Sequence, residues 1–545
     1  MLVFRENRVS ISAQLLVQTL AEKLRTIDRS GDALLDALLS AGEVECALAD
    51  AGCSDALKIG AVTDALASML VRGSVFENAG VQQNLSSSAD LPEFVKVSPP
   101  EGFAYYALHP LKYADLAAKM PIESRHAAVI GIRSIGTTLS AVVVAALQQR
   151  GIRVERITVR PTGHPFHRAT HFTGEQAAWV ERNQGAAFLV VDEGPGLSGS
   201  SFISVGEALV RAGVERERIR FLCSHHPKPE SLCAENGAAR WSNFGTCAID
   251  QNSYLPQERS PDFGGGGWRQ HVFSSETQWP SCWPQMERVK FLSADRKRLF
   301  KFEGYGNIGT EVWERNRAIA RAGFGPEPSA FSNGFIAYPW IEGERGAARK
   351  VSESLLVRLA DYCVYRSQEF RRGTVRPASL AEMLRCNLQE EFGVDAEVDE
   401  SQLEPRVATI VDGHMHPHEW VQSADGLWLK VDGGSHGDDH FYPGATDIAW
   451  DLAGAIIEWE LDPQATQYFL ERYRARTGDN PTSRLPAYLL AYAAFRLGYC
   501  KMAAESVSEA NEKERLTRDY RRYRSYAEEL LPENAFRVQV STSPR

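Results

Sequence analysis

The sequence predicts a multidomain protein, in which an N-terminal helical extension precedes an α/β unit with a parallel sheet and an α+β unit. Three observations lead to this fold class. At 545 residues the chain is too long for one hydrophobic core. From about residue 96, apolar strand-like runs alternate with helical segments, which is typical of a parallel sheet covered by helices. Beyond the glycine run Gly264–Gly267, short strands precede a mainly helical stretch.

The amino-acid composition and net charge disfavour some classes of binding partner. Hydrophobic residues make up 43% of the chain, charged residues 24%, and the net charge is -10, which disfavours general binding to nucleic acid or anionic membranes. The longest apolar run, Leu139–Leu147, is too short to cross a bilayer, and the N-terminus lacks a signal-peptide pattern. Nine cysteines without a Cys-x-x-Cys pair indicate reduced thiols. We expect a cytoplasmic protein with small-molecule substrates, no membrane and no nucleic acid.

Residues 1–95 form the predicted helical extension. Apolar periodicity over residues 11–72 indicates helices, with an interruption at Ala51–Gly52, and Gln82–Asp90 is a polar linker. No pattern in this part suggests chemistry. We interpret the extension as a lid or as a dimerisation element, so a homodimer stays open.

The predicted elements of the second and third parts follow from short apolar runs. Residues 96–262 contain four predicted strands, Ala127–Ile132, Val154–Val159, Ala187–Val191 and Ile219–Ser224, and helices ending at Gln149 and running from Ser201 to Ala212. Residues 268–532 contain predicted strands Val289–Leu292 and Arg298–Phe302, a helix near Glu311–Ala320, an apolar stretch Phe335–Trp340, and further helices to about Glu529. Residues 533–545 are a predicted mobile tail.

The most informative motif is Val190–Phe202. It places Asp192 and Glu193 at the end of a buried strand, before a Gly- and Ser-rich turn that opens a helix. Backbone N–H groups and hydroxyls in such a turn can hold a phosphate, while the carboxylates suit vicinal ribose hydroxyls. The motif resembles the signature of type I phosphoribosyltransferases, although its spacing is about one residue longer and Ser replaces Thr. The resemblance implies a phosphate-binding set of Gly196, Ser198, Gly199, Ser200 and Ser201.

A second loop, Gly131–Thr138, also follows a strand and opens a helix. In this family the corresponding loop holds pyrophosphate with backbone N–H groups and a positive side chain, which implies roles for Arg133, Ser134, Gly136 and Thr137. The stretch from Arg160 to Arg168 takes the place of the family's mobile hood. Over residues 96–260 the resemblance implies magnesium-dependent displacement of pyrophosphate from phosphoribosyl pyrophosphate by a nitrogenous acceptor.

Residues 265–530 resemble the aminoglycoside and choline phosphotransferases of the kinase-like fold. Within Arg298–Phe302, the resemblance makes Lys301 the contact for nucleotide phosphates, with Glu311 or Glu314 as its helix partner. Tyr338 lies in the stretch that approaches the hinge between the two lobes. ATP and Mg2+ are the implied cofactors.

The catalytic loop departs from that family. Its pattern is His-Gly-Asp-x-His-Pro-x-Asn, and this chain has His414 in place of the catalytic Asp and Glu419 in place of the metal-binding Asn. Asp412 is an alternative base, and Asp432 takes the place of the metal-binding Asp. An added segment, His436–His440, supplies Asp438 as a further metal ligand or as an alternative catalytic Asp.

These motifs lead to a bifunctional enzyme as the first hypothesis. One part transfers a phosphoribosyl group and the other phosphorylates a related small molecule. The altered loop favours a second hypothesis, a phosphoribosyltransferase regulated by a nucleotide-binding pseudokinase. A third is a non-catalytic sensor of phosphoribosyl ligands, against which the retained Asp192 and Glu193 argue.

Overall fold

The computed structural model describes residues 1, 3, 9–27, 31–73, 90–164, 166–196, 198–257, 259–373, 380–394, 399–436 and 444–531. Most of the predicted linker Gln82–Asp90, the site residue Asp438 and the predicted tail 533–545 lie outside the described residues. Among the described helices, none combines the length and apolarity needed to cross a membrane.

The N-terminal extension is helical, as predicted. Its helices are α1 (Ala13–Thr26), α2 (Gly31–Asp50) and α3 (Ala56–Arg72). A two-stranded antiparallel sheet of β1 (Val9–Ser12) and β2 (Phe94–Val97) joins the start and end of the extension. The Ser12 hydroxyl caps α1 by accepting the N–H of Leu15, which is why the helix begins directly after the strand.

The predicted parallel sheet is confirmed, and each of its four predicted strands is placed within one residue. Its strands, in the spatial order β4-β3-β5-β6-β7, are Arg153–Val159, His126–Ile132, Ala187–Val191, Ile219–Cys223 and Gly245–Ala248. The helices of this part are α5 (Glu101–Ala104), α6 (Leu111–Lys119), α7 (Gly136–Gln149), α8 (Gly174–Arg182), α9 (Ser200–Arg211) and α10 (Gly237–Trp241).

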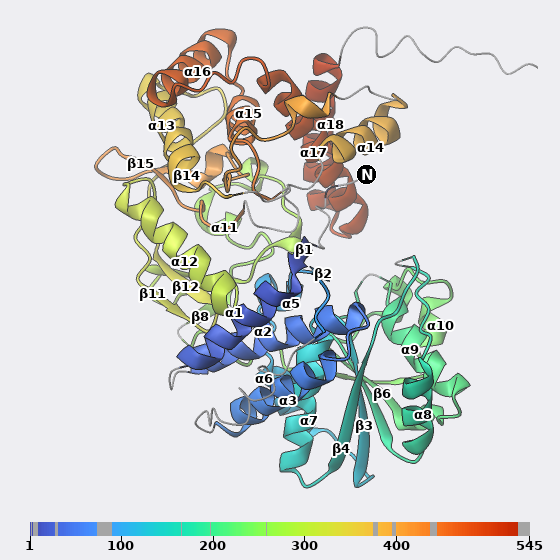
Figure 1. Ribbon diagram of the computed structural model, residues 1–545. Coiled ribbons are helices and arrows are strands. Elements are labelled where there is room, and N and C mark those ends of the chain that lie inside the picture. The colour runs from blue at the N-terminus through green and yellow to red at the C-terminus, as the bar shows by residue number, and fades with distance from the viewer. Residues whose placement is uncertain are drawn as a thin grey trace, which may run out of the picture.

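Helices cover both faces of this sheet because its strands are apolar on both sides. Ala127 and Val129 of β3 pack into a core with α7 and the extension helices. Ala128 and Ile130 pack on the opposite face, in a core that includes Phe202 of α9. Figure 1 shows α2 and α3 beside α7, so the extension forms an outer layer over this side of the sheet.

A second, antiparallel sheet has the order β11-β12-β10-β9-β8. Its strands are β8 (Arg259–Asp262), β9 (Lys290–Ser293), β10 (Arg298–Phe302), β11 (Ala330–Ser332) and β12 (Phe335–Pro339), and α11 (Arg269–Val272) and α12 (Gly306–Arg321) accompany it. Phe300 and Phe302 of β10 pack toward the core of the extension helices, whereas Leu299 packs with the residues on the α12 side. Strand β8 precedes Gly264–Gly267 and pairs with β9, which follows it. This glycine run, where a domain boundary was expected, therefore lies in a connection between two strands of one sheet.

The remainder is a mainly helical lobe, as predicted, with a small sheet at its edge. The helices are α13 (Glu353–Glu369), α14 (Leu380–Phe392), α15 (Ala449–Glu458), α16 (Pro463–Thr477), α17 (Leu485–Ser506) and α18 (Ala510–Leu530). The small sheet is formed by β13 (Glu344–Arg345), β14 (Trp420–Gln422) and β15 (Trp428–Lys430). The aromatic residues Trp420, Trp450 and Trp459 are fully buried in this lobe.

The short helix α5 lies between the parallel-sheet part and the second sheet. The carbonyl of Phe103 accepts the N–H of Tyr305 at 3.0 Å, and the carbonyl of Ala104 accepts from Arg288 Nη1 at 3.2 Å. On its other side, Gly102 lies so close to Glu193 that an added Cβ would be 2.8 Å from Glu193 Oε2. A four-residue helix therefore contacts both of the regions that carry the predicted sites.

Candidate functional site

A cavity of about 780 Å3 lies between the second sheet and the helical lobe. Strands β9, β10 and β12 contribute one wall, and the loop 414–419, Asp432 and helices α15, α17 and α18 contribute the other. The predicted residues Lys301, Tyr338, His414, Glu419 and Asp432 all line it. The structure thus brings together residues that lie more than 130 positions apart in the sequence.

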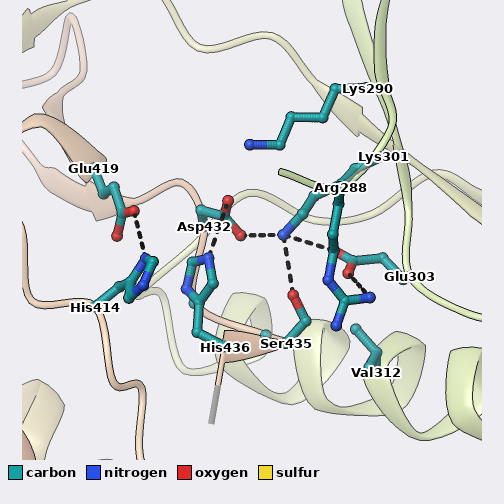
Figure 2. A network of polar contacts seen from close by, with 12 residues as sticks. Arg288, Lys290, Lys301, Glu303, Val312, His414, Glu419, Asp432, Ser435 and His436 are labelled. Atoms are coloured by element: carbon teal, nitrogen blue, oxygen red, sulfur yellow. Dashed lines mark hydrogen bonds and ion pairs between the residues drawn. The ribbon is translucent and has the colours of Figure 1, made fainter. Parts of the chain in front are cut away.

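Lys301 is the centre of the polar network in this cavity. Its Nζ lies 2.6 Å from Asp432 Oδ1, donates to Ser435 Oγ at 3.0 Å, and lies 3.3 Å from Glu303 Oε1 (Figure 2). The side chain is only 4% exposed. Lys301 therefore joins the strand wall to the loop wall through its ion pair with Asp432.

In the structure, the two predicted helix partners of Lys301 pair with other residues. Glu311 pairs with Arg372 at 2.8 Å and Glu314 with Arg317 at 3.2 Å, both on the exposed side of α12. The helix begins at Gly306, five residues before the predicted start, and its inward positions include Arg315 and Asn316. The carboxylate beside Lys301 is instead Glu303, which follows β10 and carried no motif signal.

Tyr338 belongs to this network. Its hydroxyl donates to Glu303 Oε1 at 3.1 Å and accepts from Asn316 Nδ2 at 2.9 Å. Arg288 lies 3.6 Å from the other Glu303 oxygen, Oε2. Tyr338 is therefore a positioning residue for Glu303, in addition to lining the cavity.

Asp412, the alternative base, lies inside the protein and not at the cavity surface. Its carboxylate is fully buried, accepts the Tyr362 hydroxyl at 2.5 Å, and lies 3.3 Å from Lys430 Nζ. Although burial opposes it, Lys430 holds the pKa of Asp412 below its usual range. Asp451 of α15 accepts the N–H groups of Asp412 and Gly413, so both carboxylates shape the loop from inside.

His414 and Glu419 face each other across the loop. His414 Nδ1 lies 3.3 Å from Glu419 Oε1, and Glu419 Oε2 accepts from Lys430 Nζ at 2.7 Å. Burial, together with the neighbouring His436 ring, lowers the pKa of His414 to about 3. Its imidazole is therefore neutral at physiological pH, unlike the carboxylate that it replaces in the family pattern.

His416 and Glu458 form a pair that the sequence did not suggest. His416 Nδ1 lies 3.3 Å from Glu458 Oε2, and Glu458 also accepts hydrogen bonds from the hydroxyls of Tyr492 and Tyr523. A carboxylate at Nδ1 favours the tautomer whose Nε2 can accept a proton. The pair forms because α15 packs against the loop, and no short sequence motif indicates this packing.

Lys290 of β9 is another residue of this cavity that was not predicted from the sequence. It lines the cavity, and although burial opposes it, Glu287 and Asp432 raise the pKa of Lys290 to about 12. Figure 2 shows its ammonium group directed toward the region between Asp432 and Glu419. Two lysines on adjacent strands, Lys290 and Lys301, thus supply fixed positive charge to one wall.

The second predicted site lies at the carboxyl edge of the parallel sheet. Strands β3 and β5 are neighbours, with Gly131 opposite Val191, and the strand order reverses at this pair. Ligands bind at such a switch point in open α/β sheets. An added Cβ on Gly136 would lie 2.6 Å from the Val191 carbonyl oxygen, so the two loops approach closely enough to require glycine here.

The carboxylates of this edge are strongly buried. Burial raises the pKa of Asp192 to about 7 and, with the nearby Asp192 charge, that of Glu193 to about 8. In the following turn, Gly196 and Gly199 have φ values of 62° and 66°, and Ser198 Oγ donates to Ser200 Oγ at 3.0 Å. The half-buried Ser201 belongs to the first turn of α9.

Two positive residues of the neighbouring loops, Arg133 and Arg160, contact the extension. Arg133 Nη1 lies 3.2 Å from Asp50 Oδ1, and Arg160 Nη2 lies 2.5 Å from Asp50 Oδ2. Ser134 is exposed with φ 140°, whereas Thr137 is fully buried. Arg168 is half-buried and donates to the Gly163 carbonyl at 2.6 Å. The C-terminal end of α2 therefore occupies the side of the loop where the resemblance places pyrophosphate.

Comparisons with known proteins find several solved structures that are similar to part of the chain. No protein-family model matches it, and no curated protein matches its sequence. Choline kinase LicA from Streptococcus pneumoniae is similar over 44% of this chain and 90% of its own, with 15% identity and a TM-score of 0.30. Ethanolamine kinase from Plasmodium vivax is similar over 46% and 80%, with 9% identity and a TM-score of 0.31. Macrolide 2′-phosphotransferase from Brachybacterium faecium is similar over 43% and 88%, with 15% identity and a TM-score of 0.28.

Proposed function

We propose that the cavity between the second sheet and the helical lobe, the interlobe cavity, binds a nucleoside triphosphate with a divalent cation. The protein would transfer the terminal phosphoryl group to a small hydroxylated molecule. The observation that carries this proposal is the contact of 2.6 Å between Lys301 and Asp432 at the junction of the two walls. Phosphoryl transfer depends on positioning and on charge stabilisation, and a lysine facing a cation-binding aspartate supplies both.

The side chains of the cavity take distinct roles in this proposal. Lys301 and Lys290 neutralise phosphate oxygens from the strand wall, where their positions are fixed by β-sheet pairing. Asp432 and Glu419 offer carboxylate oxygens suited to a divalent cation. When bound, that cation neutralises charge on the phosphates. His416 accepts the proton of the acceptor hydroxyl at Nε2, while Glu458 holds its ring through Nδ1.

Calorimetric titration of the full chain with ATP and a divalent cation tests this assignment. We expect Lys301→Met to weaken nucleotide binding at least about tenfold, because a charge-assisted contact is lost, and Glu314→Gln on exposed α12 to leave it unchanged. His416→Gln should retain nucleotide binding and lose phosphoryl transfer. Equal nucleotide affinity in wild type and Lys301→Met would contradict the proposal, and binding without any turnover would favour the regulatory pseudokinase instead.

We also propose, as a second function, that the edge of the parallel sheet binds the ribose 5-phosphate group of phosphoribosyl pyrophosphate and supports its transfer. The supporting observation is that the loops after β3 and β5, with Asp192 and Glu193, meet at the sheet's switch point. The carboxylates accept hydrogen bonds from the ribose hydroxyls, and the turn from Gly196 to Ser200 offers N–H groups to the phosphate.

Titration with phosphoribosyl pyrophosphate and magnesium tests this second function separately. We expect micromolar binding in the wild type and its loss in Asp192→Ala/Glu193→Ala. Glu215→Gln, in an exposed ion pair with Arg218 on the same part of the chain, is the control that should bind normally. Binding that survives the double substitution would refute the assignment.

A further inference from the structure

Three side chains in the interlobe cavity converge as metal ligands do. One ligand atom each from His414, Glu419 and His436 lies within 4.8 Å of the other two. The His414 and His436 rings stack with their centroids 3.9 Å apart, and all three residues line the cavity (Figure 2). His414 and Glu419 belong to one loop, and the fold brings His436, which follows β15, to these two residues.

We propose that His414, Glu419 and His436 bind a divalent transition-metal ion of the zinc type, in preference to magnesium. Magnesium favours a shell of oxygen ligands and water, whereas imidazole nitrogen favours zinc and its neighbours in the first transition row. Two histidines and one glutamate with an open position form a common donor set for catalytic zinc. The two imidazoles distinguish this set from an all-oxygen site, and they are the reason to expect zinc and not magnesium.

Two of the three ligands already have the spacing that such an ion requires. Two ligands at tetrahedral zinc are about 3.3 Å apart when each bond is about 2.0 Å, and His414 Nδ1 already lies 3.3 Å from Glu419 Oε1. Lys430 binds the other glutamate oxygen, Oε2, at 2.7 Å, which orients Oε1 toward the histidine. The loop thus holds its first two ligands near their final spacing.

His436 has the surroundings of a metal ligand as well. Its Nε2 lies 3.6 Å from Asp432 Oδ2, and a carboxylate at one ring nitrogen is the usual partner of a metal-bound histidine. Its Nδ1 is buried, lies 3.9 Å from Asp412 Oδ1, and makes no hydrogen bond to the part of the chain that the structure describes. Buried polar atoms are normally satisfied, so this ring has bonding capacity that the described side chains do not use.

Three protein ligands leave a coordination position open to the cavity. A phosphate or hydroxyl oxygen of a bound molecule can occupy it, which gives the site access to substrate. As an account of the cation used in phosphoryl transfer, this inference rests on the proposed function. As an account of metal binding, it is independent of nucleotide.

The test is a metal titration of the full chain after chelator treatment, with no nucleotide present. Zn2+, Mn2+ and Mg2+ are titrated against a competing chromophoric chelator, and bound metal is counted by mass spectrometry. We expect a Zn2+ affinity at least about 100-fold above that for Mg2+. His414→Ala and His436→Ala should each lower the Zn2+ affinity at least about tenfold, whereas His418→Gln, a cavity histidine outside the set, should not.

A second measurement does not depend on the folding of variants. Cu2+ bound to the wild-type chain should show nitrogen hyperfine splitting in its electron paramagnetic resonance spectrum, because two imidazoles coordinate it. Oxygen-only coordination, or Mg2+ binding as tight as Zn2+ binding, would overturn the inference. Zn2+ binding without nucleotide binding would leave the metal site standing and remove the proposed phosphotransferase.

Discussion

Two buried carboxyl groups at the edge of the parallel sheet make stability depend on pH. The pKa is raised from 3.8 to about 7 for Asp192 and from 4.5 to about 8 for Glu193, chiefly by burial. The folded state therefore binds more protons than the unfolded state, so these groups lower the free energy of unfolding as pH rises from about 4 to about 8. Ionised carboxylates accept hydroxyl hydrogen bonds better, so ligand affinity should rise over the same window.

We expect Asp192→Asn/Glu193→Gln to melt at a higher temperature than wild type near about pH 8.5 and at a similar temperature near about pH 4. The variant no longer has to bury two negative charges. Thermal unfolding followed by circular dichroism at both pH values measures the difference. A gap of the same size at both values would show that the carboxyl protons are not its cause.

Glu458 should matter more to stability than most charged residues. It is 1% exposed and accepts hydrogen bonds from Tyr492, Tyr523 and Arg522. Glu458→Ala leaves those donors and the buried Arg496 without their carboxylate, and removing one partner of a buried pair costs about 3–5 kcal/mol. Denaturant unfolding should show this loss, while Glu314→Gln on exposed α12 should change the free energy of unfolding little.

At the scale of elements, helix α2 contacts two arginines of the predicted phosphoribosyl site. Its Asp50 contacts both Arg133 and Arg160. Asp50→Asn frees these guanidinium groups, and because a partly exposed ion pair is worth up to about 1 kcal/mol, we expect pyrophosphate affinity to rise up to about fivefold. Isothermal titration with inorganic pyrophosphate measures this, with Glu22→Gln of α1 as control. Weaker binding in Asp50→Asn would mean that Asp50 orients the arginines instead of competing for them.

Elements with a strong local pattern were predictable. Strands β5 and β10 have their predicted limits, because the first is an apolar run that ends at Asp192 and the second follows a polar hairpin turn and ends before Glu303. The start of α12 was missed, since Gly306 is a poor helix former and the first turn is fixed by tertiary contacts, such as Asp36 with the N–H of Asn307. Strand β8 has only four residues with a proline among them and gave no signal.

Residues of the candidate site were predictable where a sequence motif contains them. They were not predictable where only the folded structure brings them together. Lys301, Asp432, His414 and Glu419 line the cavity as a set, and their mutual distances then show which pairs interact. Glu303 was missed because its partners come from three separate segments. The same reason applies to the pairing of His416 with Glu458.

For the molecule as a whole, one core spans the extension, the parallel sheet and part of the second sheet. Leu38 of α2, Val142 of α7 and Phe302 of β10 belong to it. We therefore expect these three parts to unfold in one cooperative transition. Differential scanning calorimetry, with the ratio of calorimetric to van't Hoff enthalpy, measures this. A separate early transition of the extension would show that the shared core is energetically divided.

The position of α5 has a thermodynamic consequence. Gly102 contacts Glu193 at one proposed site. At the other, Ala104 accepts a hydrogen bond from Arg288, which lies beside Glu303, and Glu303 in turn lies beside Lys301. If a ribose ligand moves this helix and thereby alters nucleotide affinity by some factor, nucleotide must alter ribose-ligand affinity by the same factor. The affinity for each ligand would then depend on the concentration of the other, through the single turn of α5. Each ligand's titration, repeated with the other at saturation, should give equal ratios.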